Sequence, residues 1–166
     1  ATTGVTYFIY CTSNYPLNLN ISNNTISNHT LPGTGAIYGI YQLSNPVNTN
    51  ISNNNINTIT RTGTTSTAAF YGINCDNTTA TTLTNVFGNV IHTLTGNGST
   101  GVVGGITMGT QTTYNTYKNK IYNLTSDNAG GLVYGITIAT GLITANVYNN
   151  LIGGLNAPNT SSTADA

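Results

Sequence analysis

A short figure of two asparagines and an isoleucine returns five times along this chain, at intervals of about thirty residues. In each copy the second Asn stands four residues after the first, and the Ile stands two residues after the second Asn. The five copies are Asn20/Asn24/Ile26, Asn50/Asn54/Ile56, Asn85/Asn89/Ile91, Asn115/Asn119/Ile121 and Asn146/Asn150/Ile152. A period of roughly 20 to 50 residues predicts a solenoid, in which one structural unit stacks on the next.

Each repeat contains a second figure, which ends in Ile and precedes the first Asn by about ten residues. Its copies are Tyr38-Gly39-Ile40, Tyr71-Gly72-Ile73, Gly104-Gly105-Ile106 and Tyr134-Gly135-Ile136, with Tyr7-Phe8-Ile9 as a weaker first copy. Short alternating segments between turns rich in Gly, Thr, Ser and Asn predict strands. Helices are not expected, because the chain has no Glu and few Leu or Lys to fill a helical face.

Two or three strands in about thirty residues, with no helix between them, can stack on their equivalents only as a parallel coil. The sequence therefore predicts an all-β, right-handed parallel β-helix, or β-solenoid, since parallel crossover connections take that hand. We expect one domain over 1–166 with about five coils, at approximately 1–34, 35–67, 68–100, 101–130 and 131–166. Hydrophobic residues are only 38% of the chain, which suffices for the narrow core of such a fold.

The repeated Asn and Ile positions have a structural interpretation. Stacked Asn side chains can hydrogen-bond amide to carbonyl from coil to coil, so we expect internal Asn ladders along the axis. The repeated Ile positions form an internal ladder beside them, and a second column lines the same interior. This second column is Ile9, Ile40, Ile73, Ile106 and Ile136. The glycines before these Ile residues are expected where the backbone bends or approaches closely.

The two cysteines occupy one column of the repeat, because each stands two residues after its Ile. Cys11 and Cys75 are two coils apart, with Gln42 between them, which places them about 9.6 Å from each other. A disulfide requires Cα atoms within about 6.8 Å. We therefore expect two buried free thiols.

Charged residues make up 4% of the chain, against about 25% in an average domain. The bases are Arg61, Lys118 and Lys120, and the acids are Asp76, Asp127 and Asp165. Three scattered cations cannot form a basic patch, so no nucleic acid partner is expected. No apolar run approaches 18 residues, so no membrane span is expected either. The composition favours an extracellular or cell-surface protein.

The few titratable residues do not converge on one place. The three acids fall in different columns, which argues against a paired-carboxylate site. His29 and His92 stand at different positions of coils two apart, and no carboxylate or thiolate would complete a metal site with them. We therefore expect a non-enzymatic protein with no catalytic residue, no metal and no cofactor.

Two surface patterns suggest binding functions. Thr58-Ile59-Thr60 and Thr93-Leu94-Thr95 occupy equivalent places, and strand alternation would point Thr58, Thr60, Thr93 and Thr95 outward. Such rows resemble the ice-binding faces of β-helical antifreeze proteins, although Thr is also simply a good strand residue.

A second pattern is aromatic. Tyr10 and Tyr41 directly follow Ile9 and Ile40 and are expected to point outward. Exposed Tyr can stack on sugar rings or on a protein partner, and the same pair could equally be ordinary cross-strand packing. The sequence thus allows a glycan-binding module as a further alternative.

The ends of the repeat are also informative. Gly4, Gly35, Gly101 and Gly131 each stand five residues before the Ile of their coil, so the chain holds a whole number of coils. Neither an amphipathic helix nor a charged strand is expected to cap either end, which leaves unpaired strand edges. We expect these edges to meet another copy head to tail, or further coils of a longer chain.

The repeats resemble a known family. The Tyr-Gly-Ile and Asn-Asn figures, and the closing stretch VYNNLIGGLNAP at 147–158, are similar to the right-handed β-helix repeats of very large secreted surface proteins of Bacteroidetes bacteria. The resemblance implies export by the type IX secretion route and a role at the cell surface, in a fibre or as an adhesin. The expected function is a structural or adhesive β-solenoid that stacks end to end in a rod or filament.

Overall fold

The computed structural model describes residues 3–12, 17–76, 83–98, 101–109, 112–127, 130–138 and 144–157. These residues form fifteen strands in three parallel sheets of five strands each, and no helix occurs among them. The chain is a parallel β-solenoid with three strands per coil, as the thirty-residue repeat predicts.

The three sheets contain equivalent strands of successive coils. Sheet A holds β1 (Thr6–Cys11), β4 (Ile37–Gln42), β7 (Phe70–Cys75), β10 (Val102–Met108) and β13 (Leu132–Ile138). Sheet B holds β2 (Asn18–Ser22), β5 (Asn48–Ser52), β8 (Leu83–Phe87), β11 (Thr113–Tyr117) and β14 (Thr144–Tyr148). Sheet C holds β3 (Thr25–Leu31), β6 (Asn55–Arg61), β9 (Val90–Gly96), β12 (Lys120–Ser126) and β15 (Leu151–Asn156).

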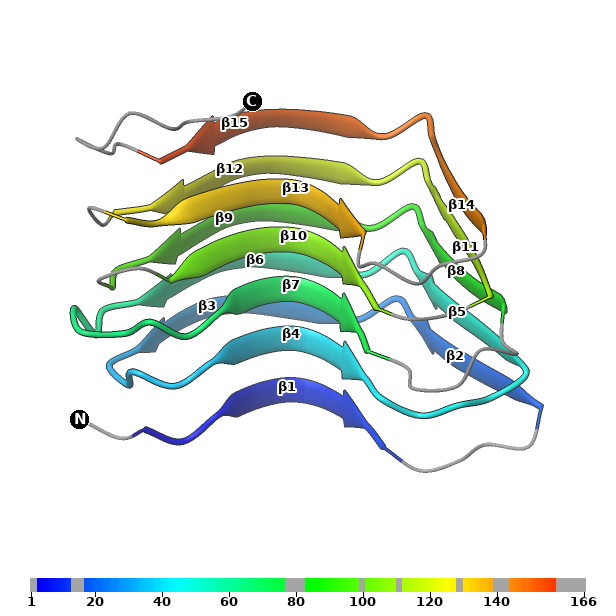
Figure 1. Ribbon diagram of the computed structural model, residues 1–166, viewed down its shortest axis with the longest axis horizontal. Helices are drawn as coiled ribbons and strands as arrows, with labels where there is room; N and C mark the ends of the chain where they lie inside the picture. Colours follow the sequence, from blue (N-terminus) through cyan, green and yellow to red (C-terminus); the bar gives the residue numbers. More distant parts are fainter. Residues whose placement is uncertain are drawn as a thin grey trace.

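The path of the chain gives the hand of the coil. In Figure 1 the strands of sheet A run from left to right in the nearer layer, and those of sheet C return from right to left behind them. The chain climbs from β1 at the bottom to β15 at the top, so the coil is right-handed, as predicted. The number of turns differs slightly from the expected five: the chain returns to sheet A four times after β1 and then makes a last pass through β14 and β15.

The predicted Ile columns line the interior. Ile40, Ile73 and Ile106 are register partners in sheet A and are fully buried. The Ile column of sheet C is likewise fully buried at Ile56 and Ile91. Because the sheets enclose one narrow interior, these columns form a single core cluster.

The glycines that directly precede the Ile residues of sheet A form a glycine column, where side chains of sheet C closely approach the backbone of sheet A. A Cβ atom on Gly105 would lie 2.6 Å from Cγ2 of Ile121 and 2.6 Å from the carbonyl oxygen of Gly135. Gly72 has the same relation to Ile91, at 2.7 Å. The Ile side chains of sheet C therefore reach the backbone of sheet A only because these positions lack a side chain.

The corner between sheets B and C has the same conformation in every coil. One residue with positive φ is followed by the second Asn of the repeated Asn-Asn-Ile figure. The positive-φ residues are Asn23, Asn53, Gly88, Lys118 and Asn149, with φ of 59°, 55°, 65°, 56° and 54°. Asn and Gly tolerate this left-handed conformation well, whereas Lys adopts it at some cost. The turn aims the following Asn into the corner.

A second column of positive φ crosses sheet C in mid-strand, at Asn28, Thr58, Thr93, Asn123 and Gly154. Strands β6 and β9 pair through Asn57 with His92 and through Ile59 with Leu94, and the register omits the residues between. The strand thus bends here. In β6 the two consecutive residues Asn57 and Thr58 lie outside, between the buried Ile56 and the buried Ile59.

The cysteine column is as predicted. Cys11 pairs in register with Gln42, and Gln42 pairs with Cys75, so the two thiols are separated by one strand and are free. Cys75 is fully buried, whereas Cys11, in the first coil, is only partly buried. The expectation of two buried thiols is therefore wrong for Cys11, which lies on β1, the end strand of sheet A among the described residues.

Candidate functional site: the asparagine ladders, the end faces and the outer surface

The second Asn of each figure forms an inner ladder at the corner between sheets B and C. Its members are Asn24, Asn54, Asn89, Asn119 and Asn150. Each backbone N–H and each Nδ2 donates to Oδ1 of the next Asn toward the C-terminus, over 2.9–3.0 Å. The Nδ2 of Asn89 also donates to the carbonyl of Ile51 at 2.9 Å. All four hydrogen-bonding positions of that buried side chain are therefore satisfied.

The first Asn of each figure forms an outer ladder on the outside of sheet B. Its members are Asn20, Asn50, Asn85, Asn115 and Asn146. Each Nδ2 donates to Oδ1 of the preceding Asn, toward the N-terminus, over 2.8–2.9 Å. The expectation of internal ladders therefore holds for the second Asn only. In sheet B the inward positions flanking the outer ladder belong to residues such as Ile51 and Val86, which are fully buried.

The last coil leaves the core columns open. Val147, Ile152 and Leu155 are 43%, 42% and 40% exposed. In the preceding coil, Ile121 pairs with Ile152 and Leu124 pairs with Leu155, and both of these partners are fully buried. The first coil differs, since its core residues Ile21 and Ile26 are only 6% and 7% exposed. Apolar side chains at inward positions are thus uncovered mainly on the C-terminal face.

A departure from the repeat accounts for this asymmetry. Phe8 stands in the glycine column of sheet A, and its ring lies 4.5 Å from the ring of His29. His29 stands at a column position that is apolar in the next coil, where Ile59 pairs with it in register. The aromatic pair thus packs across the interior of the first coil, between sheets A and C.

The outside of sheet A carries a tyrosine cluster, formed by Tyr7, Tyr10, Tyr38, Tyr41 and Tyr71. The ring centroids of Tyr7 and Tyr10 are 4.4 Å apart, and those of Tyr10 and Tyr41 are 5.5 Å apart. The Tyr41 hydroxyl donates to the carboxylate of Asp76 at 2.9 Å. Burial, and secondly the bond to Asp76, raise the pKa of Tyr41 above its ordinary value.

Sequence reasoning placed Tyr10 and Tyr41 outside, and the structure agrees, since Tyr10 is about half exposed. It placed the column of Tyr7, Tyr38 and Tyr71 inward or at a corner, whereas Tyr7 and Tyr38 contact rings of the outer Tyr column and Tyr71 contacts Tyr38, and it missed Asp76. Two consecutive buried residues, Gly39 and Ile40, stand between Tyr38 and Tyr41, so both rings lie outside and touch, although their spacing of three residues does not indicate it.

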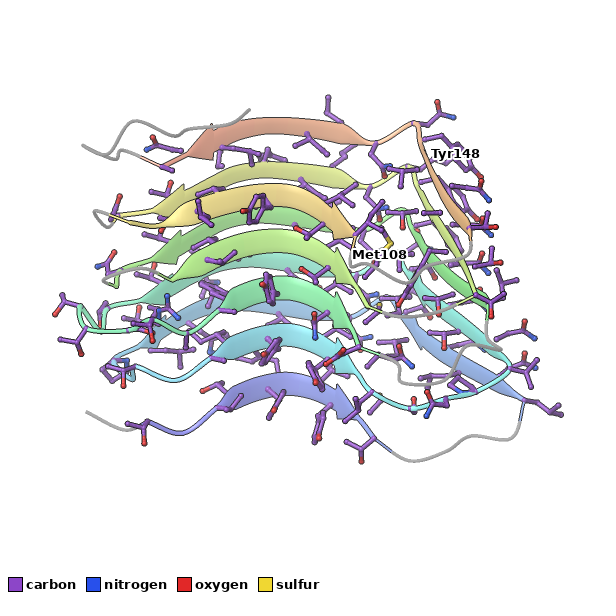
Figure 2. The ribbon with its side chains drawn as sticks, in the orientation of Figure 1. Met108 and Tyr148 are labelled. Atoms are coloured by element: carbon purple, nitrogen blue, oxygen red, sulfur yellow. The ribbon has the colours of Figure 1, made fainter. Side chains whose placement is uncertain are left out.

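Sequence reasoning also missed an aromatic column on the outside of sheet B. Phe87, Tyr117 and Tyr148 stack nearly parallel, with centroids 5.0 and 5.1 Å apart and interplanar angles of 3° and 2°. Figure 2 labels Tyr148 at β14, on the right-hand side of the molecule. The spacing of about thirty residues between these rings was the available signal.

The threonine rows of sheet C do not lie along regular strands. Thr58 and Thr93 are exposed, but both have positive φ at the mid-strand bend. Thr60 and Thr95 pair in register and are half-buried, while the residues between, such as Ile59, are fully buried. The outward direction predicted for these residues agrees with their exposure, but the bend separates the two rows.

Arg61 is buried, and not a surface cation. Its Nη1 donates to the carbonyl of Ala68 at 2.7 Å and its Nε donates to the carbonyl of Asn97 at 3.3 Å. A Cβ on Gly101 would lie 2.6 Å from Nη2, so glycine makes room for the guanidinium. Burial lowers the pKa of Arg61. The side chain ties the loops between sheets C and A of neighbouring coils to each other.

The histidines take part in ring contacts. His29 contacts Phe8, as described above, and His92 stacks on Tyr122 with centroids 4.7 Å apart. Within the described ranges, no three His, Cys, Asp or Glu side chains lie close enough to share a metal ion. The same part of the chain contains no helix that is long and apolar enough to cross a membrane.

No protein-family model, no curated protein and no solved structure matches this chain. The function must therefore be inferred from the solenoid, its ladders and its faces.

Proposed function

We propose that this chain is a non-enzymatic structural module of an extracellular rod or fibre, in which copies stack end to end. The observation that carries the proposal is the C-terminal face, where Val147, Ile152 and Leu155 continue columns that are buried in the coils before. Contiguous exposed apolar side chains mark interaction sites. Among the described residues β14 and β15 are also the last strands of their sheets, with no strand paired to their outer edges, so a further coil is the partner that fits.

The composition supports a fixed assembly. With 4% charged residues and a formal net charge of zero, copies of the chain repel each other little.

The proposed setting is the bacterial cell surface. Support comes from the resemblance of the Tyr-Gly-Ile and Asn-Asn figures to secreted surface proteins of Bacteroidetes, which implies type IX secretion and an adhesin or filament. The very low charge content is also compatible with an extracellular location.

Sedimentation velocity over a concentration series, with negative-stain microscopy of the same samples, tests the stacking. We expect the mass to rise above the 17.3 kDa of one chain with concentration, together with rods one solenoid wide. A single 17.3 kDa species at every concentration would overturn the proposal.

A matched pair of variants in β15 locates the contact. Leu155→Lys places a charge in a column whose members Ile59, Leu94 and Leu124 are fully buried, and should abolish stacking. Leu151→Lys adds the same charge to the same strand, in an outward column that already contains Lys120, and should leave stacking intact. Equal effects of the two changes would contradict contact through the core columns.

The tyrosine cluster favours a second candidate function, glycan binding. Several Tyr rings beside the carboxylate of Asp76 combine apolar surface with a hydrogen-bond acceptor for sugar hydroxyls. Titration with cello- and chito-oligosaccharides, followed by NMR, tests it. Tyr10→Ala should abolish binding, and Tyr41→Phe, which keeps the ring, should weaken it less. No shift with either series would reject this second candidate.

A further inference from the structure

The two asparagine ladders run in opposite directions, and this gives each end face a different hydrogen-bonding character. In the inner ladder Asn119 donates to Asn150, toward the C-terminus. In the outer ladder Asn146 donates to Asn115, toward the N-terminus. The following inference rests on the proposed stacking and concerns which faces meet and through which atoms.

The C-terminal face offers donors from Asn150 and an acceptor from Asn146. Among the described residues the backbone N–H of Asn150 has no Oδ1 partner, although the same group binds one in each of the four coils before, for example in Asn119. The Oδ1 of Asn146 receives no donor from the described residues, whereas Oδ1 of Asn115 receives one.

The N-terminal face offers the complementary pair. No described residue donates to Oδ1 of Asn24, and Nδ2 of Asn20 donates to no described residue. The Nδ2 of Asn24 turns instead to the carbonyl of Ser22 at 3.1 Å. In later coils the equivalent Nδ2 donates to a carbonyl of the preceding coil, as Asn54 does to Ile21 at 2.9 Å.

We propose that a second copy of this chain docks its N-terminal face on the C-terminal face of the first, with both ladders continuing across the junction. Asn150 of the first copy donates its N–H and Nδ2 to Oδ1 of Asn24 of the second copy. Asn20 of the second copy donates Nδ2 to Oδ1 of Asn146 of the first. The Nδ2 of Asn24 then moves from Ser22 to the carbonyl of Val147 of the first copy.

The apolar columns agree with this arrangement. Continuing the register would place Ile26 of the second copy beside Ile152 and would place Ile21 beside Val147. Two like faces could not satisfy the ladders in this register, because acceptor would meet acceptor and donor would meet donor. The ladders therefore select head-to-tail rods with one polarity.

Asn20→Asp tests the inference with little disturbance inside the chain. The introduced carboxylate retains an oxygen to accept the Nδ2 of Asn50, now at 2.9 Å from Oδ1, but it loses the donor that faces outward. At the junction this carboxylate meets Oδ1 of Asn146, so acceptor opposes acceptor. We expect the dissociation constant for stacking to rise about tenfold or more.

Asn18→Asp is the matched control. It lies on the same strand and face, and it retains its bond from the Nδ2 of Asn48, now at 3.1 Å. Its register column ends at Thr144, whose hydroxyl can donate to a carboxylate. We expect stacking close to that of the unaltered chain, and unchanged urea midpoints for both variants would show that both fold.

Acidification provides a second readout. When the carboxylate introduced by Asn20→Asp takes up a proton, near pH 4 for an ordinary carboxyl, it regains a donor. Stacking of this variant should then recover toward that of the Asn18→Asp control. If both variants stack equally at neutral pH, continuation of the ladder is refuted while stacking stands. If the unaltered chain does not stack at all, the proposed function fails together with this inference.

Discussion

In the buried corner of the solenoid, Asn89 donates both its backbone N–H and its Nδ2 to Oδ1 of Asn119, and each donor lies 3.0 Å from this oxygen. The same side chain accepts both equivalent bonds from Asn54. A buried polar group is expensive unless it is fully hydrogen-bonded, and here every coil supplies the partners of the next. The inner ladder therefore gives stability only when coils are stacked in this register.

The two ladders should differ in their contribution to stability. Asn89→Ala removes one buried member and leaves the groups of Asn54, Asn119 and Ile51 without partners, so we expect a loss of about 3 kcal/mol or more. Asn85→Ala removes a half-exposed member of the outer ladder, where water replaces the lost bonds, and should cost about 1 kcal/mol or less. Urea unfolding measures both, and similar losses would contradict the distinction.

The glycine column should tolerate no side chain. Gly105→Ala forces a Cβ to within 2.6 Å of both Ile121 and the backbone of Gly135, and should destabilise the chain by about 1 to 3 kcal/mol. Gly153→Ala is the control, since its Cβ would have no atom within 4 Å, and its effect should stay within about 0.5 kcal/mol. Thermal unfolding of the pair checks the prediction, which a stable Gly105→Ala variant would refute.

The two thiols should differ in reactivity. Burial, and secondly the charge of Asp76, raise the pKa of Cys75 to about 12, so its thiolate is scarce at neutral pH. Cys11 is only partly buried, although burial raises its pKa as well. In the native chain iodoacetamide should modify Cys11 first and Cys75 only on unfolding. Mass spectrometry of the digested protein, with Cys11→Ala as control, would show whether Cys75 reacts early instead.

Stability should fall in alkaline solution. The folded pKa of Cys75 and of Tyr41 lies above the unfolded value, so above about pH 9 the unfolded chain loses protons more readily than the folded chain. The free energy of unfolding must then decrease as pH rises. Asp76→Asn removes one cause of both shifts and should make the decrease shallower. Urea midpoints between about pH 8 and 11 test this, and parallel curves for the two proteins would contradict it.

Much of the fold follows from the repeat, but the two Asn positions show where the pattern stops. The interval of about thirty residues identified which residues stack, and Ile56 and Asn54 lie inside as expected. The same interval predicted that Asn50 would be internal too, yet it lies on the outer face. A stacking period records which residues are neighbours along the axis, and it does not record on which side of the strand each one lies.

Arg61 illustrates a second limit. From the sequence it was one of three scattered cations, whereas in the structure it is buried at a corner and bound to the carbonyls of Ala68 and Asn97. Its site depends on Gly101, from a coil further along, which leaves space for the guanidinium. No local pattern around Arg61 indicates this, because the space is made by a residue more than thirty positions away.

By itself, the sequence determined the architecture of this protein: the parallel stack, the Ile columns and the pairing of Cys11 with Gln42 and of Gln42 with Cys75. It could do so because equivalent residues that recur about every thirty positions meet their own copies in a solenoid. The tertiary structure alone decided that the two ladders run in opposite directions and that the C-terminal face is more open than the N-terminal one. Those properties depend on the orientation of each Asn side-chain amide and on how far each coil is buried by its neighbours, and both arise only when the coils pack together.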